Sequence, residues 1–575
     1  MPSILVLKRD FEHLLGAAID LAALPRELEV AKAELKGYDA GSDELKIELN
    51  DTNRPDLWSP EGLARQLRLA RTGALPRYAF FDAADAAGMP GMPEIRVDPA
   101  LRDIRPYVAG FLASGAKLDD AGLRSLIQSQ EKLAESFGRR RHAVAIGVYR
   151  ADRIRFPVHY RAADPNADRY IPLGFDRPLT LAAILDQHPK GREYGHLLRG
   201  KPRFPLLVDG AGEVLSMPPI VNSQALGAVE VGDHELFVEV TGHDLRILLL
   251  ALNIAAVDLA DRGARIGSLA VVYPYKTPFG RRLRTPFDFA KPQRVPLRLI
   301  ETMLGETLPA SEIQACLGRS GYRDIRAARG SVTVTPPVYR DDLLHAVDVI
   351  EDIAIARGYN TFDPVLPEEF TVGRISPEET LARLISDLMI GAGFQQVVSN
   401  ILTSSETLLD RMGRTGAEAG LIEIENVMSA NFAVLRDSVL PSLLAVEAVS
   451  SKAAYPHRMF EVGECAVTDP ATILGVRSPL KLGALIAHAA ATFSELHSTL
   501  DALLFYLGHE HAIEPAEQPF FLPGRAGRIR IEGYLAGWIG ELHPQCLERW
   551  DIGVPASGFE LDLGVLLGRT PATPK

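Results

Sequence analysis

The stretch Tyr339–Asn360, YRDDLLHAVDVIEDIAIARGYN, decides how the sequence around it is interpreted. Its apolar residues recur at spacings of three and four, which is typical of one stripe along a helix: Leu343, Val347, Ile350 and Ala354. Acidic residues at i, i+3 and i+4 share a face nearly opposite that stripe: Asp348, Glu351 and Asp352. We therefore expect one helix that Asp341 or Asp342 caps at its start and Gly358 ends.

The acidic face of this expected helix allows two interpretations. Its carboxylates repel one another, and no Lys lies three or four residues away to relieve that repulsion. A hard divalent cation would relieve it, because Mg²⁺ prefers oxygen ligands and usually takes only one or two carboxylates directly. A solvated acidic face on the surface of the protein is the alternative.

A pattern just before the acidic helix favours the metal. Pro337, Arg340 and Asp342 form a P-x-x-R-x-D pattern, and the run resembles the B5 domain of phenylalanyl-tRNA synthetase beta chains. That resemblance implies that magnesium binds the four positions Asp342, Asp348, Glu351 and Asp352. Helical geometry alone would turn Asp342 away from the other three, so we expect it at the helix cap.

Length and composition are those of a multidomain globular protein. The chain has 575 residues, 47% of them hydrophobic and 24% charged, which suits about four domains. Neither a signal-peptide layout nor an apolar run long enough to cross a bilayer occurs in the sequence, so we expect a cytoplasmic protein without a membrane partner. The widely spaced Cys316, Cys465 and Cys546 indicate neither a zinc site nor a disulfide framework. A net charge of −12 means that any RNA binding depends on local basic patches.

Residues 1–88 are expected to form a small α/β module. The segment LKIEL alternates as a strand, and Ser59 and Pro60 then start a helix. Between them, Arg54 and Asp56 belong to a turn, for which a structural role is the better interpretation. The string NRPDLWSPEGLAR is also similar to the N-terminal module of the same family, which is a second and independent match.

Residues 89–275 resemble the B3/B4 domain, which in the family hydrolyses tyrosine wrongly attached to phenylalanine tRNA. The layout SMPPIVNS followed by VEVTG is closer to the archaeal and eukaryotic form. The resemblance implies an editing site formed by five residues: Leu207, Ser216, Asn222, Glu239 and Thr241. Equal strand parity points Glu239 and Thr241 to one face, where a carboxylate can accept from a tyrosyl hydroxyl while Ser216 or Thr241 positions a water. Taken alone, these are ordinary strand residues.

Such a second site has a physical reason. A pocket built for Phe rejects Tyr by only about a hundredfold, because an added hydroxyl is a weak basis for exclusion. The clearest basic cluster in this region is Arg139, Arg140 and Arg141, at the end of an expected helix. It suits a helix C-terminus electrostatically, and it is also a candidate contact for the tRNA acceptor end.

The remaining chain divides into three parts. Residues 276–294 hold three prolines and six Lys or Arg residues without an apolar period, which predicts a linker. Residues 295–365 then form the B5-like domain, and 374–575 resemble a class II aminoacyl-tRNA synthetase core, an antiparallel sheet with helices on one side. In that core Arg458 and Glu461 stand at a spacing that differs from the family's ATP-binding strand, and LPGRAGRIRI lacks the late Gly-rich strand, so the resemblance implies a catalytically silent copy.

The sequence is therefore identified as a member of the phenylalanyl-tRNA synthetase beta family, of the compact archaeal-like type. The expected fold is α+β and multidomain: an N-terminal α/β module, a B3/B4-like editing domain, a B5-like domain and a silent class II core. The resemblance implies an alpha subunit that carries the ATP site, an α2β2 heterotetramer, tRNA(Phe) as a partner and Mg²⁺ as a cofactor. A free-standing tRNA-binding or aminoacyl-tRNA deacylase protein is the alternative.

Overall fold

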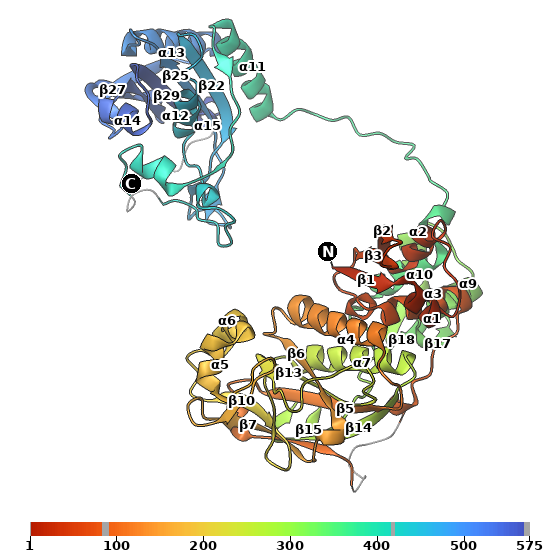
Figure 1. Ribbon diagram of the computed structural model, residues 1–575. Helices are drawn as coiled ribbons and strands as arrows, with labels where there is room; N and C mark the ends of the chain where they lie inside the picture. Colours follow the sequence, from red (N-terminus) through yellow and green to blue (C-terminus); the bar gives the residue numbers. More distant parts are fainter. Residues whose placement is uncertain (1, 83–90, 416–419, 569–575) are drawn as a thin grey trace. The chain divides into compact units, whose positions relative to one another are not determined.

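The computed structural model describes residues 2–82, 91–415 and 420–568, and the chain divides into two compact units. Unit 1 ends at Val365 and unit 2 begins at Leu366 (Figure 1). Residues 363–375 between them belong to no helix or strand, and their side chains are exposed. The expected boundary at residues 88–89 lies outside the described residues.

The N-terminal module has the expected α/β layout. Its three strands pair in the order β1-β3-β2, with β1 at Ser3–Leu7, β2 at Ala33–Asp39 and β3 at Glu44–Leu49. Helices α1 (Lys8–Leu15) and α3 (Pro60–Thr72) cover the sheet. The Ser59 hydroxyl accepts from the Gly62 amide and Pro60 takes the first helical position, so the predicted start of α3 is confirmed.

A ten-stranded sheet forms the centre of unit 1, in the order β12-β11-β10-β7-β4-β14-β5-β13-β6 with β15 beside β14. The strands are β4 (Glu94–Val97), β5 (Tyr107–Ser114), β6 (Val144–Arg150), β7 (Val158–Ala163), β10 (Phe204–Val208), β11 (Val214–Met217), β12 (Val221–Asn222), β13 (Glu235–Gly242), β14 (Arg265–Thr277) and β15 (Gly280–Thr285). Helices α4 (Asp120–Lys132) and α7 (Leu245–Asp261) lie along it, and α5 (Leu181–Gln187) and α6 (Pro189–Tyr194) lie near its β10 end (Figure 1). Strands β10 and β11 pair antiparallel as a hairpin.

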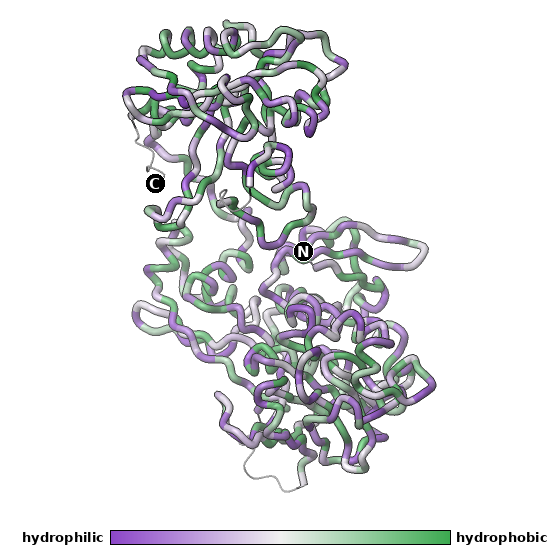
Figure 2. The backbone as a smooth tube through the Cα atoms, turned by 90° about the vertical axis from the view of Figure 1, so that its left-hand side faces the viewer, coloured by the Kyte–Doolittle hydropathy of each residue, from purple (hydrophilic) through white to green (hydrophobic). Residues whose placement is uncertain are grey.

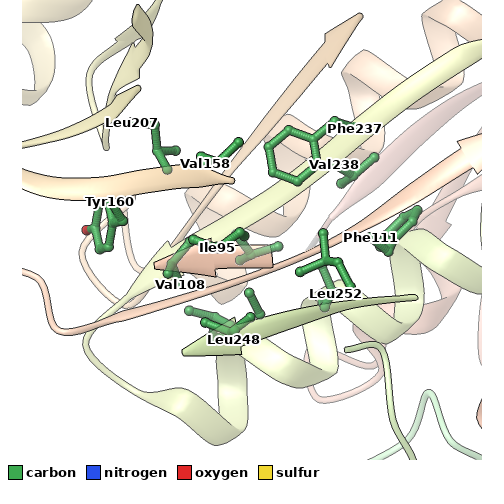
Figure 3. Close-up of a cluster of buried hydrophobic side chains, with 14 of the residues drawn as sticks. Ile95, Val108, Phe111, Val158, Tyr160, Leu207, Phe237, Val238, Leu248 and Leu252 are labelled. Carbon is green, nitrogen blue, oxygen red and sulfur yellow. The ribbon is translucent and has the colours of Figure 1, made fainter. Parts of the chain in front are cut away.

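Helix α7 is apolar because it is buried on nearly every side. Leu248 and Leu252 are fully buried against Val108 and Phe111 of β5 (Figure 3). At its C-terminal end α7 contacts the N-terminal module: fully buried Arg65 of α3 donates to Asp258 at 3.0 Å and to Asp261 at 2.7 Å. These contacts place α7 between the sheet and the module.

The same helix also contacts the B5-like part. The side-chain amide of Asn253 donates to the backbone carbonyls of Val338 and Phe287, at 3.0 Å each. Asn253 is fully buried, so a polar residue in an otherwise apolar helix joins two later segments of the chain.

The expected linker at 276–294 is wrong. This segment contains the end of β14, all of β15 and the start of β16 (Gln293–Pro296), and β15 pairs antiparallel with β14. Phe279, Phe287 and Phe289 pack together and against the sheet core. The linker prediction was based on the prolines and basic residues and did not take the three phenylalanines into account.

The B5-like part contains the expected small sheet and helices. The strands pair in the order β16-β18-β17, with β17 at Arg323–Ala328 and β18 at Ser331–Thr335, beside α8 (Leu297–Leu304) and α9 (Ala310–Arg319). The acidic helix α10 runs from Ala346 to Arg357, later than predicted, with His345 at its N-cap. Its buried apolar stripe is therefore Val349, Ile350, Ile353 and Ala354, whereas Val347 is 40% exposed.

Unit 2 is a seven-stranded sheet in the order β19-β22-β25-β29-β28-β27-β26. Its strands are β19 (Gln395–Gln396), β22 (His457–Glu464), β25 (Leu480–Ala487), β26 (His511–Pro515), β27 (Phe521–Ile531), β28 (Tyr534–Leu542) and β29 (Ala556–Asp562). Neighbours are antiparallel except for β19 and β22. The predicted antiparallel sheet is thus present.

Helices cover both faces of this sheet, not one. Helices α11 (Pro377–Gly391) and α13 (Phe493–Leu507) share a hydrophobic cluster with Phe460. Helices α12 (Leu440–Val449) and α14 (Pro544–Arg549) share another cluster with Met459, the neighbouring residue on β22. Because adjacent strand residues point to opposite faces, the two helix pairs lie on opposite faces of the sheet.

Hydrophobic and hydrophilic stretches alternate along the chain (Figure 2). Among the described residues no helix is both long enough and apolar enough to cross a membrane.

Candidate functional site

A cavity of about 460 Å³ opens in unit 1 between α4, β6 and the segment from β11 to β12. Its walls are mostly apolar, and polar groups enter from a few positions. Three of the five residues expected in an editing site line it: Ser216, Asn222 and Glu239. They converge because β11 and β13 each present alternate residues to the same side of the sheet, and Ser216 pairs directly with Asn222.

Tyr149 joins two of these residues in a network that sequence reasoning missed. Its hydroxyl lies 2.8 Å from Ser216 Oγ and 2.9 Å from Glu239 Oε1. A phenol has one proton, so Tyr149 can donate to the carboxylate while the Ser216 hydroxyl donates to Tyr149. All three side chains are buried, which fixes the carboxylate at the cavity wall.

Glu239 is a buried carboxyl group with one oxygen left over. It is 3% exposed, and no group of the described residues bonds to its Oε2. Burial raises the pKa of Glu239 to about 7, although the Tyr149 hydrogen bond and the charge of Arg105 oppose that rise. The cavity therefore presents an acceptor oxygen whose hydrogen-bonding capacity the protein does not use.

The structure does not bring Thr241 and Leu207 to the cavity. The Thr241 hydroxyl accepts from Arg105 Nε at 2.9 Å, and both residues are almost fully buried. Thr241 has the same strand parity as Glu239, but Arg105 binds its hydroxyl and its carbonyl, and Thr241 does not line the cavity. Leu207 packs in the hydrophobic core with Tyr160, its neighbour on β7 (Figure 3).

Arg139, Arg140 and Arg141 do not continue a helix. Their φ angles are +51°, +53° and +64°, so they form one left-handed turn after α4 and its extension to Phe137. Arg139 and Arg140 are exposed, whereas Arg141 lines the cavity. Its guanidinium donates to the carbonyls of Pro219 and Ile220, at 3.1 and 3.0 Å, and supports the wall opposite α4.

A second site lies where α10 meets the N-terminal module. A small pocket there is lined by all four expected magnesium ligands: Asp342, Asp348, Glu351 and Asp352. Lys32 of the module contacts Glu351 at 2.7 Å and Asp51 at 3.1 Å. The cation that local sequence spacing could not supply to the helix thus comes from more than three hundred residues away.

Arg340 holds two of the four carboxylates. Its guanidinium contacts Asp342 at 2.7 Å and Asp352 at 2.6 Å, and Asp352 also accepts from the Tyr322 hydroxyl at 2.7 Å. Burial would raise the pKa of Asp342, but the Arg340 charge and hydrogen bonds hold it below its usual value. Asp342 is not a helix cap, because it lies before the start of α10 and is bound to Arg340.

The prediction that Asp341 or Asp342 caps the start of the acidic helix is wrong for both residues. The Asp348 carboxylate accepts from the backbone amides of Leu344 and His345, at 2.7 and 2.6 Å, so it takes part in the cap itself. Asp341 pairs with Arg246 of α7. Gly358 follows the helix with a φ of +97°, as a glycine is expected to do there.

Two family models match the chain: "tRNA synthetase B5 domain" at residues 294–359 and "Phenylalanyl tRNA synthetase beta chain CLM domain" at residues 363–563. The chain is also similar to the phenylalanine–tRNA ligase beta subunit of Treponema pallidum, with 40% identity over 607 residues, 99% of this chain and 100% of that protein. The corresponding subunit of the archaeon Thermococcus gammatolerans is 40% identical over 98% of both chains. The chain belongs to the family of phenylalanine–tRNA ligase beta subunits.

A solved structure supports the same assignment. An N-terminal fragment of the phenylalanyl-tRNA synthetase beta subunit from Pyrococcus horikoshii is 39% identical, with a TM-score of 0.58. The match covers 62% of this chain and all of the fragment. The predicted family is thereby confirmed, and the multidomain α+β fold agrees with it.

In this member of the ligase family, the charged residues of unit 2 that resemble an ATP site already have partners. Glu461 is buried in an ion pair with Arg436 at 2.8 Å, and Arg458 contacts Glu495 at 2.8 Å. The arginines of β27 are also engaged: Arg525 with Glu541, Arg528 over the Trp538 ring and Arg530 with Glu514. A triphosphate would have to break these contacts.

The network around Glu239 requires a glycine. A Cβ at Gly147 would lie 2.2 Å from the Tyr149 hydroxyl oxygen and 2.5 Å from Glu239 Oε1. We expect Gly147→Ala to displace this pair and to destabilise the fold by about 1–3 kcal/mol. Gly267→Ala is the matched control, because its Cβ would approach no atom closer than 3.5 Å. Thermal unfolding of the two full-length variants tests this, and equal midpoints would contradict it.

The raised pKa of Glu239 predicts a pH-dependent stability. The folded state holds the proton more tightly than the unfolded state, so stability falls as pH rises from the ordinary pKa of 4.5 to about 7. Glu239→Gln removes this loss, which is worth about 3 kcal/mol above neutral pH. Relative to the parent, the variant's unfolding midpoint should rise by a few degrees between about pH 5 and about pH 8.

Glu235→Gln, on the same strand but outside the cavity lining, is the control for this effect and should show no such trend. A difference between Glu239→Gln and the parent that stays constant with pH would contradict the prediction.

Proposed function

We propose that this chain, as a phenylalanine–tRNA ligase beta subunit, works in an α2β2 heterotetramer whose alpha subunit holds ATP and attaches Phe to tRNA(Phe). The contacts of Glu461, Arg458 and the β27 arginines support this division of labour, because these charged groups are already engaged and would have to leave their partners to bind a triphosphate. The three cysteines are buried and unpaired, which suits the reducing cytoplasm. The comparisons over the full chain favour this function over a free-standing deacylase.

The cavity at Glu239 is the proposed editing site, where Tyr is removed from mischarged tRNA(Phe). The observation that carries this proposal is the buried Glu239 Oε2, which has no hydrogen-bond partner in the part of the chain that the structure describes. A tyrosyl hydroxyl would donate to that oxygen, whereas a phenylalanyl ring would leave it buried and unpaired. Ser216 and Asn222 are placed to orient a water toward the ester, and Tyr149 holds the carboxylate in position.

Residues that lie behind the cavity have a supporting part in this proposal. Thr241 acts through Arg105, whose charge faces Glu239. Leu207 supports the position of Ser216, with which it pairs across β10 and β11. Neither residue touches the substrate.

The exposed arginines next to the cavity are the proposed contact for the tRNA acceptor end. Arg139 and Arg140 project from the left-handed turn, and Arg141 keeps that turn joined to the cavity wall. Phosphate binding by exposed guanidinium groups depends on salt concentration. In the assay described next, reversing the charge of Arg139 and Arg140 should raise the KM for mischarged tRNA and reduce its salt dependence.

Co-expression with the alpha chain tests the proposed function. Phe charging should require both chains, and the complex should release Tyr from Tyr-tRNA(Phe). Glu239→Ala should reduce Tyr release by about a hundredfold or more and leave Phe charging unchanged, because the lost group binds only the tyrosyl hydroxyl.

Glu235→Ala, on the same strand, is the control and should behave like the parent complex. Undiminished Tyr release by Glu239→Ala would show that this cavity is not the editing site. Charging by either chain alone would refute the division of labour.

The acidic pocket is the proposed magnesium site. Its donor set fits Mg²⁺, because all four carboxylates reach one pocket and this ion prefers oxygen ligands. Arg340 already neutralises Asp342 and Asp352, so Asp348 and Glu351 are the residues that would hold the ion. Mg²⁺ would supply positive charge between α10 and the N-terminal module, in a role that is structural.

Lys32 then competes with the metal for Glu351. Removal of Lys32 and removal of the Glu351 charge should therefore change the Mg²⁺ affinity in opposite directions. Lys32→Ala should tighten Mg²⁺ binding by about fivefold, since a partly exposed ion pair is worth up to about 1 kcal/mol. Glu351→Gln should weaken binding. Lys36→Ala, which removes a lysine paired with Glu34, is the control.

The Mg²⁺-dependent shift of the unfolding midpoint measures these effects without any activity assay. A parent chain that shows no shift, or weaker binding by Lys32→Ala, would refute the site.

A further inference from the structure

Two histidines and an aspartate meet in unit 2, far along the chain from both sites described above. His497 and Asp501 lie one turn apart on α13, and His511 is the first residue of β26. Only residues 508–510 connect the helix to the strand. The short connection brings the start of β26 against the same face of α13 that carries His497 and Asp501.

The ligand atoms of these three residues already cluster. Asp501 Oδ1 lies 3.3 Å from His497 Nε2 and 2.9 Å from His511 Nε2. One ligand atom from each residue lies within 4.8 Å of the other two. In a tetrahedral zinc site with bonds of about 2.05 Å, ligand atoms are about 3.3 Å apart, so small side-chain rotations suffice to place an ion among them.

The chemistry of the three groups selects the kind of ion. Imidazole nitrogens suit zinc and the late first-row transition metals, whereas Mg²⁺ and Ca²⁺ prefer oxygen ligands alone. Among the described residues, this is the group of at least three histidine, cysteine or acidic side chains in which one ligand atom from each lies within 4.8 Å of the others. We propose that His497, Asp501 and His511 bind a divalent transition-metal ion, with Zn²⁺ as the best fit and water in the remaining position.

The position of the cluster indicates what the ion would do. Strand β26 is at the edge of the seven-stranded sheet and pairs only with β27. Helix α13 is anchored to the sheet by buried leucines, among them Leu496 and Leu500, on the turns that carry His497 and Asp501. A metal ion bound by the three side chains would therefore fasten the edge strand β26 to helix α13. The strand would then be held in place without a second neighbouring strand.

The contacts without an ion give the competing account. Asp501 can accept hydrogen bonds from both imidazoles and hold them together with no metal. The side chain of His511 is 15% exposed, and those of His497 and Asp501 are 36% and 49% exposed, so an ion from solvent could reach the cluster. The two accounts differ in one observable, the affinity of the full chain for Zn²⁺.

Calorimetric titration of the metal-free full-length chain with Zn²⁺ measures that affinity. We expect one site of micromolar or tighter affinity that is lost or weakened at least about tenfold in His511→Ala and in His497→Ala, since even second-shell changes at metal sites cost that much. His509→Ala is the matched control, because His509 lies two residues from His511 but contacts Glu532 instead. The visible spectrum of added Co²⁺, a probe of coordination geometry, should change in the same variants and not in the control.

The result that would overturn the proposal is equally specific. Equal Zn²⁺ affinity of the parent, His511→Ala and His497→Ala would place any bound zinc elsewhere, and a parent without a site stronger than millimolar would leave only the hydrogen-bonded triad. Asp501→Asn, which preserves the shape of the side chain, gives the same decision if a histidine variant fails to fold. Phe charging and Tyr release do not enter these measurements, so their outcome does not affect the test.

Discussion

The ion pairs between buried Arg65 and the carboxylates of Asp258 and Asp261 determine how unit 1 is assembled. They join the N-terminal module to α7, and α7 in turn packs on the central sheet and contacts the B5-like part through Asn253. Burial raises the pKa of Asp258 to about 7, with the Arg65 charge opposing that rise. Without Arg65, a desolvated carboxylate pair would remain, which costs about 3–5 kcal/mol when one partner is removed. Assembly of the N-terminal module is thus tied to the central sheet by charge.

The need to pair a buried carboxylate also distinguishes the structural carboxylates from the one proposed to recognise substrate. Asp258, Asp342 and Asp352 each have a buried arginine within hydrogen-bonding distance. Glu239 accepts a hydrogen bond from Tyr149 and has no arginine in direct contact among the described residues, and its Oε2 is the carboxylate oxygen that remains both buried and unpartnered among them. Because leaving such a group unsatisfied is costly, its persistence at a cavity wall is better explained by a ligand than by stability.

Local sequence signals predicted the parts of the fold that depend on neighbouring residues. The LKIEL strand and the Ser59–Pro60 helix start follow from alternating hydropathy and capping, which act over a few residues. The predicted start of α10 was wrong, because Asp342 is bound by Arg340 and the Asp348 carboxylate accepts from the backbone amide at the cap. The prediction of a linker at 276–294 was wrong because Phe279, Phe287 and Phe289 pack on a sheet whose other strands lie elsewhere in the sequence.

The proposed editing site shows the same division. Strand parity pointed Glu239 and Thr241 to one face, but parity could not show that Glu239 lines the cavity and Thr241 does not, since a residue two positions along a strand is displaced by about 6.6 Å. The hydroxyl and carbonyl of Thr241 are instead bound by Arg105, which lies just before β5. Tyr149 and Lys32 were missed for the same reason: each completes a site on a distant segment.

The charged groups that neutralise the carboxylates of a site therefore decide its chemistry, and the spacing of residues along the sequence does not reveal these partners. On α10 the residue spacing predicts three carboxylates on one face but no cation beside them to neutralise them. In the fold Arg340 neutralises the buried Asp352, and Lys32 only partly covers Glu351, whose side chain is 49% exposed. A metal ion can displace a partly exposed lysine far more easily than a buried, bidentate arginine. The proposed place for Mg²⁺ on this helix therefore depends on which carboxylate the fold leaves weakly paired, and the acidic residues alone do not determine it.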